Sequence, residues 1–221
     1  MSDLNLIIGN KNYSSWSLRP WMLLRHLGLP FRETLLTLDT PEFKGQIAQY
    51  GPTGRVPVLL HDGLSIWDSL AICEYLVELA GRGLPTDRSA RAVARSVSAE
   101  MHSGFSALRA QWPMNARARN RHTPITSALQ ADLERVQEIW LDCRRRFGQH
   151  GPWLFGDYSM ADAMYAPVVL RFNSYGPRSY AEQMSEDARR YVSTALEDPH
   201  LQDWIAAGEK ETWTHAHSEV G

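Results

Sequence analysis

The chain has 221 residues, of which 43% are hydrophobic and 22% are charged, and its formal net charge is −2. This length suits one large domain or two small ones, with enough apolar material for a core. A charge so close to neutral gives no electrostatic case for binding nucleic acid or an anionic membrane surface. No apolar run approaches the roughly 18–20 residues of a membrane span. The first ten residues also lack the features of a signal peptide.

The first part of the chain alternates between strand and helix patterns. An apolar run over 4–9 predicts a buried strand, and a polar loop with three serines follows it. Pro20 is tolerated only in the first turn of a helix, so we expect that helix to span about 17–27. A second strand over 31–38 and a short, irregular helix over 40–49 come next.

A hairpin and a helix follow a turn that is rich in glycine and proline. Two short apolar runs over 58–60 and 64–67 flank Asp62 and Gly63, which form a strong two-residue hairpin signal. Apolar residues then recur at helical spacing as far as Leu79. The predicted order of this part is therefore β-α-β-α-β-β-α.

Two features of this hairpin and helix suggest a ligand. A cis Val56-Pro57 bond would turn the backbone N–H and C=O of Val56 outward, ready to pair with an extended peptide. Asp68 and Ser69 suit a helix N-cap, and the free N–H groups at a helix start favour an anion such as a carboxylate. Asp68 would hold an ammonium group nearby. The alternative interpretation is an ordinary capped helix after a hairpin.

Beyond the hairpin helix the pattern becomes entirely helical. Residues 81–88 read as a linker from their glycine, proline and polar content, and Ser159 to Asp162 has the form of a capping box. We predict an α/β domain over 1–80 and an all-α domain over 89–221. The expected helices are 89–112, 127–147, 159–172 and 187–196, with a last short one after Pro199.

Neither the cysteines nor the histidines suggest a metal site. Cys73 and Cys143 fall in predicted helices and form no C-x-x-C pair, so a reducing, cytoplasmic setting is the simplest expectation. The eight histidines match no metal-ligating spacing, and we expect no metal. His215 and His217 fall in a segment that we expect to be a disordered tail.

The loop from Tyr13 to Ser17 lies between the first strand and the first helix, a common place for a site in an open α/β sheet. A hydroxyl at a helix start can donate to an anion, and the helix dipole assists it. A serine nucleophile would need a base in a fixed geometry, and the absence of a G-x-S-x-G elbow argues against a hydrolase. Taken alone, the three serines form a turn and a cap.

Together these segments resemble the glutathione transferase family across nearly the whole chain. The matching pieces are SSWSLRPW after the first strand, RVPVL, IWDSLAICEYL and the GDYSMADA capping box. The resemblance implies a thioredoxin-like first domain that binds glutathione and a helical domain that supplies the pocket for the second substrate. It also implies a homodimer. The serine-rich loop looks most like the zeta class and its bacterial relatives.

The resemblance assigns the ends of glutathione to particular residues. Val56, before a cis bond to Pro57, would pair with the backbone of the glutathione cysteine. Asp68 and Ser69 would hold the γ-glutamyl ammonium and carboxylate. Lys44 would meet the glycine carboxylate, because it is the one cation in the matching segment.

The same resemblance assigns the sulfur and the second substrate. Ser14 would donate a hydrogen bond to the glutathione sulfur, with Ser15 as the alternative. A free thiol has a pKa near 8.5, and a hydroxyl donor at a helix N-terminus favours its charged form. Trp16 would form an aromatic wall of the second-substrate pocket. Trp112 and Met114 would either line a cleft between the domains or belong to the core.

The expected activity is therefore that of a glutathione transferase in detoxification, which activates the glutathione thiol as a thiolate for attack on a small electrophile. One alternative is a zeta-type, glutathione-dependent maleylacetoacetate isomerase. Those isomerases resemble SSCSWRVR in this loop, whereas this chain has Trp16 in place of the cysteine and Trp21 in place of the second arginine. We rank the isomerase second because a pocket without that sulfur and that cation suits a diacid less well. The other alternative is a non-catalytic binding module with the same fold.

Overall fold

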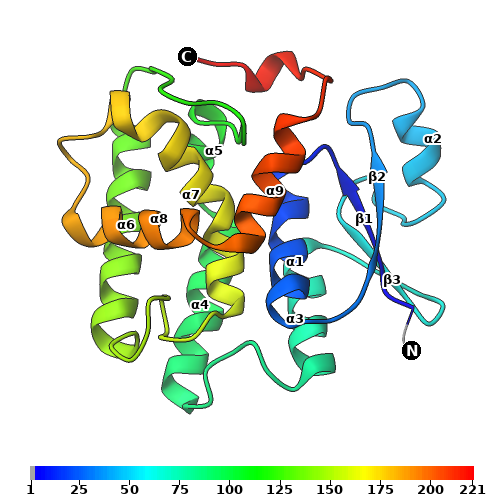
Figure 1. The fold of residues 1–221 in the computed structure, drawn as a ribbon, viewed down its shortest axis with the longest axis horizontal. Coiled ribbons are helices and arrows are strands. Elements are labelled where there is room, and N and C mark those ends of the chain that lie inside the picture. The colour runs from blue at the N-terminus through cyan, green and yellow to red at the C-terminus, as the bar shows by residue number, and fades with distance from the viewer. Residues whose placement is uncertain (1–2) are drawn as a thin grey trace.

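The computed structural model describes residues 3–221 and places a small α/β part beside a larger helical part (Figure 1). The four-stranded sheet has the order β2-β1-β3-β4. Strand β1 (Asn5–Gly9) pairs in parallel with β2 (Arg32–Leu36) and antiparallel with β3 (Val58–His61). Strand β4 (Leu64–Ile66) forms the predicted hairpin with β3. A mixed sheet of this kind with a helical second part confirms the predicted fold class.

The two faces of the sheet are covered by different helices. Because side chains alternate along a strand, Leu6 and Ile8 point into the main core, beside α1 (Ser15–His26) and α3 (Ser69–Ala80). Ile7 points to the opposite face and joins a smaller cluster that includes Ile47, at the end of α2 (Phe43–Ile47). The strand β1 is therefore buried on both faces, and it anchors the loop that leads into α1.

Helix α1 begins two residues earlier than we expected. The Leu18 N–H donates to the Ser14 carbonyl at 3.2 Å, so Pro20 lies in the second turn of the helix. Proline there removes the single N–H that would bond to the carbonyl of Trp16. The prediction that Pro20 lies in the first turn was wrong, and packing of the buried first half of α1 outweighs that loss.

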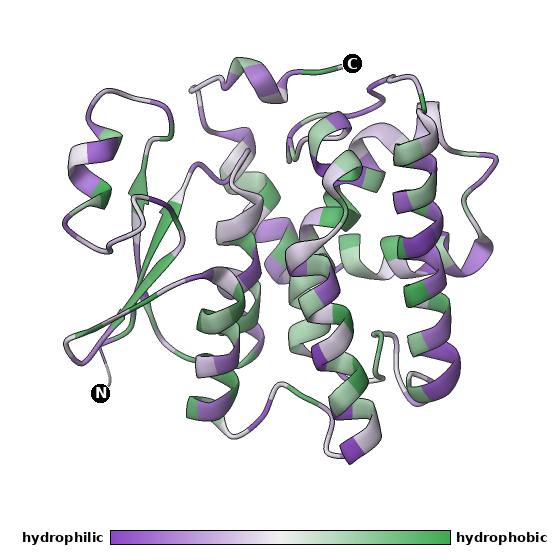
Figure 2. Cartoon of the chain, turned by 180° about the vertical axis from the view of Figure 1, so that it is seen from behind, coloured by the Kyte–Doolittle hydropathy of each residue, from purple (hydrophilic) through white to green (hydrophobic). Residues whose placement is uncertain are grey.

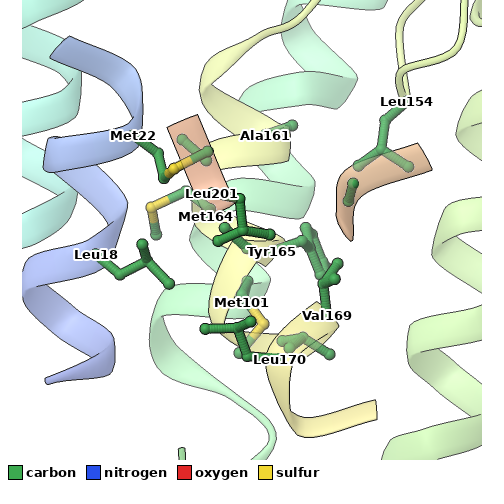
Figure 3. Packing of buried hydrophobic residues seen from close by; sticks show 14 of the residues in the cluster. Leu18, Met22, Met101, Leu154, Ala161, Met164, Tyr165, Val169, Leu170 and Leu201 are labelled. Carbon is green, nitrogen blue, oxygen red and sulfur yellow. The ribbon is translucent and has the colours of Figure 1, made fainter. Parts of the chain in front are cut away.

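The helical part is organised around α7, which is buried along most of its length. It packs against α1 and α4, and Figure 3 shows Leu18 and Met22 of α1 on the side of α7 that carries Met164. Apolar residues lie mainly on inward helix faces, and polar residues on the outer faces (Figure 2). No helix within residues 3–221 is both long and apolar enough to cross a membrane. The elements of this part are α4 (Arg88–Ser103), α5 (Ser106–Gln111), α6 (Ser127–Phe147), α7 (Met160–Ser179), α8 (Glu186–Leu196), α9 (Pro199–Glu209) and the 3₁₀ turn η1 (Ala216–Ser218).

Two predicted helix boundaries were wrong. The single helix expected over 89–112 is divided into α4 and α5, because Phe105 adopts a left-handed conformation with φ of 59°. Helix α7 continues past 172 in spite of Pro177. Packing against another segment stabilises the turns beyond residue 172, because Tyr175 stacks on Trp112 with ring centroids 5.4 Å apart.

The predicted capping box begins α7 and is confirmed. Asp162 accepts hydrogen bonds from the Ser159 N–H and hydroxyl, both at 2.9 Å. Its other carboxylate oxygen accepts from the Leu154 N–H and the Tyr191 hydroxyl, both at 3.0 Å. Burial raises the pKa of this carboxyl, although the four donors oppose the shift. Asp162 therefore ties the start of α7 to α8.

Candidate functional site

Two adjoining cavities form one groove between the α/β part and the helical part. They share Trp16, Arg55 and Val56 in their linings. We call the first, of about 510 Å³, the cap cavity because it reaches the N-cap of α3 at Asp68. The second, of about 380 Å³, is lined by Ser14 and other residues at the start of α1, and we call it the serine cavity.

The lining of the cap cavity includes an acid, Asp68, and a residue with a hydroxyl group, Ser69. Asp68 caps α3 by accepting from the N–H groups of Leu70 at 2.9 Å and Ala71 at 3.4 Å. Its second oxygen lies 2.9 Å from Nε2 of His102, which comes from α4. The Ser69 hydroxyl is buried and has no hydrogen-bond partner within residues 3–221. A ligand carboxylate would satisfy this hydroxyl, and an ammonium would be attracted to Asp68.

Val56 connects the two cavities. Its bond to Pro57 is cis, as the resemblance implied. Its backbone N–H and C=O form no hydrogen bond with another part of the described chain, although β3 begins only two residues later. Unpaired main-chain groups at this position suit an extended peptide that adds to the end of β3.

Ser14 lines the serine cavity, and its hydroxyl is linked to that of Ser17, which lies outside the cavity lining. Ser14 and Ser17 are buried and share a hydrogen bond of 2.7 Å, in which either can donate because hydroxyl hydrogens rotate. The Gly9 N–H donates to the Ser17 oxygen at 3.1 Å. When Ser17 donates to Ser14, the Ser14 hydrogen is free for an acceptor in the cavity. Ser15, in the next position, is half-buried and also lines this cavity.

Trp16 separates the two cavities and is surrounded by cationic side chains. The guanidinium carbons of Arg19 and Arg109 lie 4.3 and 4.7 Å from its ring centroid. The His102 ring meets it edge-on, with the centroids 5.5 Å apart. Burial, and then the positive charge of Arg109, lower the pKa of Arg19 and of the buried Arg171 to about 9, so both remain charged at neutral pH. Sequence reasoning did not identify the cluster of Arg19, Arg109 and Arg171, because these arginines come from three different helices.

Three other predicted site residues lie in different environments. Met114 lines the serine cavity. Trp112 lines neither cavity: it is fully buried in the helical core and donates to Thr123 Oγ1 at 2.7 Å. Lys44 is exposed on α2 and lines neither cavity, although its neighbour Phe43 lines the serine cavity.

The C-terminal segment closes one side of the serine cavity, and the prediction of a disordered tail was wrong. Ser218 lines the cavity, and Glu219 accepts from the Tyr13 hydroxyl at 2.7 Å. Arg117 and Arg121 also bind Glu219, at 3.1 and 2.7 Å. Figure 1 shows this segment lying across the end of the molecule where β1 leads into α1. Ion pairs between residues about 100 positions apart hold it there.

The comparisons with known proteins agree with this geometry. The chain matches the family model for the N-terminal domain of glutathione S-transferase over residues 13–79 and that for the C-terminal domain over residues 92–207. Maleylacetoacetate isomerase from Rattus norvegicus is 30% identical over 164 residues, which cover 70% of this chain and 71% of that protein. A probable maleylacetoacetate isomerase from Caenorhabditis elegans is 33% identical over 96 residues, covering 42% and 44%.

Solved structures extend the likeness to the whole fold. A crystal structure of a glutathione transferase homologue from Burkholderia with bound glutathione superimposes with a TM-score of 0.68 at 24% identity. The match covers 96% of this chain and 100% of the other. This likeness shows the same arrangement of elements, with glutathione bound in the related protein.

Proposed function

This chain belongs to the glutathione S-transferase family, and we propose that it activates the thiol of glutathione as a thiolate for attack on a small electrophile. One observation carries the proposal. A continuous groove leads from the unpartnered Ser69 hydroxyl, past the free backbone of Val56, to the Ser14 hydroxyl. These groups follow the order in which γ-glutamate, cysteine backbone and thiol occur in glutathione.

In this proposal the cap cavity holds the γ-glutamyl end. The Ser69 hydroxyl and the N-terminus of α3 bind its carboxylate, and Asp68 binds its ammonium group. Val56, preceding Pro57, pairs with the cysteine backbone. Lys44 meets the glycine carboxylate from α2, next to Phe43 on the cavity wall.

At the serine cavity the Ser14 hydroxyl donates to the sulfur, and Ser15 is the alternative donor. The linked Ser17 hydroxyl can supply its own hydrogen to the Ser14 oxygen, which leaves the Ser14 hydrogen for the sulfur. Lowering the pKa of a thiol by about one unit corresponds to about 1.4 kcal/mol and increases the thiolate population several-fold at neutral pH. The electrophile would then occupy the rest of the serine cavity, against Trp16 and Met114.

A zeta-type isomerase remains the second candidate, because two curated relatives are named maleylacetoacetate isomerases. Part of our reason for ranking it second is weakened by the fold. Trp21, which replaces an arginine of those isomerases, lies outside both cavities and donates to Glu33 at 2.7 Å. Its presence therefore removes no cation from the groove. Isomerisation of maleylacetoacetate that requires glutathione would support this candidate, and conjugation without isomerisation would exclude it.

The deciding experiment is the ultraviolet absorbance of the thiolate of bound glutathione against pH. We expect a thiol pKa clearly below that of free glutathione in the wild type, and a return toward the free value in Ser14→Ala. Ser96→Ala, which removes an exposed hydroxyl on α4, is the matched control. Bound glutathione that titrates as it does in water would leave only the binding-module alternative. No binding at millimolar glutathione would limit the relationship to the fold.

We also propose that the chain functions as a homodimer in the cytoplasm, divided into domains at 1–80 and 89–221 by a linker at 81–88. The break between α3, ending at Ala80, and α4, beginning at Arg88, supports that division. Both cysteines are free and buried, which is compatible with a reducing compartment. Sedimentation showing a stable monomer at micromolar concentration would contradict the homodimer.

A further inference from the structure

Three arginines converge behind and beside Trp16, and none of them contacts a carboxylate directly within the described residues. Arg19 comes from α1, Arg109 from α5 and Arg171 from α7. Arg19 and Arg171 are only 2% and 5% exposed. None of the three forms an ion pair with a carboxylate within residues 3–221. Buried charges are normally paired, so this cluster needs an explanation.

The protein satisfies these guanidinium groups only in part, and only with neutral carbonyl groups. Arg109 donates through Nε and Nη2 to the carbonyls of Met101 at 2.5 Å, His102 at 3.0 Å and Gly104 at 2.6 and 3.0 Å. Arg171 donates to the carbonyls of Trp112 and, at 3.3 Å, Arg109, through Nη1 alone. Nε and Nη1 of Arg19 are buried with no hydrogen-bond partner in the described chain. Burial lowers the pKa of Arg109, and the Asp132 carboxylate opposes this shift without forming an ion pair. The cluster therefore has unused donors on Arg19 and Arg171 and a positive charge that is only partly compensated.

Two of the arginines line the serine cavity, where the reaction is proposed to occur. Arg109 and Arg171 line the serine cavity, together with Ser14, Ser15 and Met114. Arg19 lines neither cavity, but it shares the Trp16 ring with Arg109 and adds positive charge behind the wall. Donors from the helical part thus face the space in which an electrophile would meet the sulfur.

We propose that Arg109 and Arg171 form an anion subsite in the serine cavity, and that the second substrate carries a carboxylate or a similar planar anion. This inference rests on the proposed function and names its substrate class. Guanidinium groups suit such anions because their N–H donors match two oxygens at once. Binding of the anion compensates the buried charge and holds the electrophilic carbon near Ser14. Neutral electrophiles of the same shape leave that charge uncompensated.

The test compares two electrophiles that share a reactive carbon: a chlorodinitrobenzoate and its neutral carboxamide. In both, the glutathione sulfur forms a bond to the ring carbon, the bond to chlorine breaks, chloride leaves, and the thiol proton passes to solvent. Each kcat/KM is divided by the uncatalysed rate constant with glutathione. We expect the wild type to favour the anion by about tenfold or more, the effect of one charge-assisted contact. Equal acceleration of the two electrophiles would overturn the proposal.

Variants then assign the preference to the arginines. In Arg171→Met the ratio between the two electrophiles should fall about tenfold, and Arg171→Lys should restore part of it. Arg178→Met, on the exposed face of the same helix, is the control and should leave the ratio unchanged. A variant that loses both activities equally would show that the arginine serves the fold or the thiolate and would count against the subsite.

A measurement on the wild type avoids dependence on variant folding. Benzoate should compete with the electrophile, whereas benzyl alcohol at the same concentration should not. Failure of the proposed function is distinguishable, because glutathione would then show no lowered thiol pKa and neither electrophile would be accelerated. A lowered thiol pKa with no benzoate competition would overturn the anion subsite alone.

Discussion

Nε2 of His102 lies 2.9 Å from Oδ2 of Asp68, and this contact joins the helical part to the α/β part across the cap cavity. The other oxygen of Asp68 caps α3. The acid proposed to hold the γ-glutamyl ammonium is therefore oriented from both sides. The His102 ring also meets Trp16 edge-on, so this residue of α4 contacts both Asp68 and the aromatic ring that lines the two cavities.

We predict that His102→Ala weakens glutathione binding about threefold, since the loss of one partly exposed hydrogen bond to Asp68 costs about 0.5–1.5 kcal/mol. Calorimetric titration gives the Kd directly. A glutathione analogue without the α-amino group is the control, because it has no ammonium for Asp68 to hold. An equal loss of affinity for both ligands would show that His102 acts on the shape of the groove instead.

We predict that Ser17→Ala raises the pKa of the bound thiol, but by less than Ser14→Ala does. Ser17 is buried and joins the Gly9 N–H to the Ser14 hydroxyl, so its loss frees Ser14 to turn away from the sulfur. The Gly9 N–H is left buried without this partner, which costs about 1–3 kcal/mol of the free energy of unfolding. Thiolate absorbance and urea unfolding measure the two effects. Ser17→Thr should restore both, and an unchanged thiol pKa in Ser17→Ala would exclude the relay.

We predict that Asp162→Ala lowers the free energy of unfolding by about 3 kcal/mol, because it removes a cap and leaves buried donors without an acceptor. The carboxylate accepts from Leu154, Ser159 and Tyr191. Urea denaturation followed by circular dichroism measures the change. Glu186→Ala, at an acid on α8 that is 89% exposed, should change stability by less than about 0.5 kcal/mol. A loss as small as that control in Asp162→Ala would contradict the structural role.

We predict that the protein becomes less stable as the pH falls below 6.5, partly through His200. Burial, and then the positive charge of His26, lower the pKa of His200 from its usual 6.5. A histidine with a lowered folded pKa binds its proton more tightly in the unfolded state, so stability is lost between 6.5 and that lower value. His200→Gln should flatten the dependence in this window. Burial opposes a lower pKa for Asp198, but contact with His26 outweighs it, so the pKa of Asp198 is lowered from its usual 3.8. Protonation of Asp198 therefore reduces the stability of the fold only below pH 3.8.

Unfolding midpoints at several pH values, for the wild type and His200→Gln, check this. If the two proteins lose the same stability as the pH falls below 6.5, the pH dependence belongs to groups other than His200.

Features held by contacts between residues close in the chain were readable from the sequence. The Asp68 cap joins residues two and three positions apart, the capping box joins Ser159 to Asp162, and Asp62-Gly63 closes a two-residue hairpin. Local hydrogen bonds and turn preferences decide such features, so the order of the elements and the fold class followed from them. The assignment of groove residues to parts of glutathione came from the family resemblance. Pro20 misled us only because packing of α1 outweighs a single missing N–H.

Contacts between distant residues were decided by the tertiary structure alone. His102 and Asp68 are 34 positions apart by their numbers, and Tyr13 and Glu219 are 206 apart. The arginine cluster is the clearest case, since α1, α5 and α7 each contribute one cation. A charged residue in a helix looks the same in sequence whether it faces water or a cavity. The sequence by itself determined the elements, the caps and the family resemblance. Only the packing of the helical part against the sheet decided which charges meet in the groove. Those meetings depend on the orientations of whole helices, which no local sequence pattern specifies.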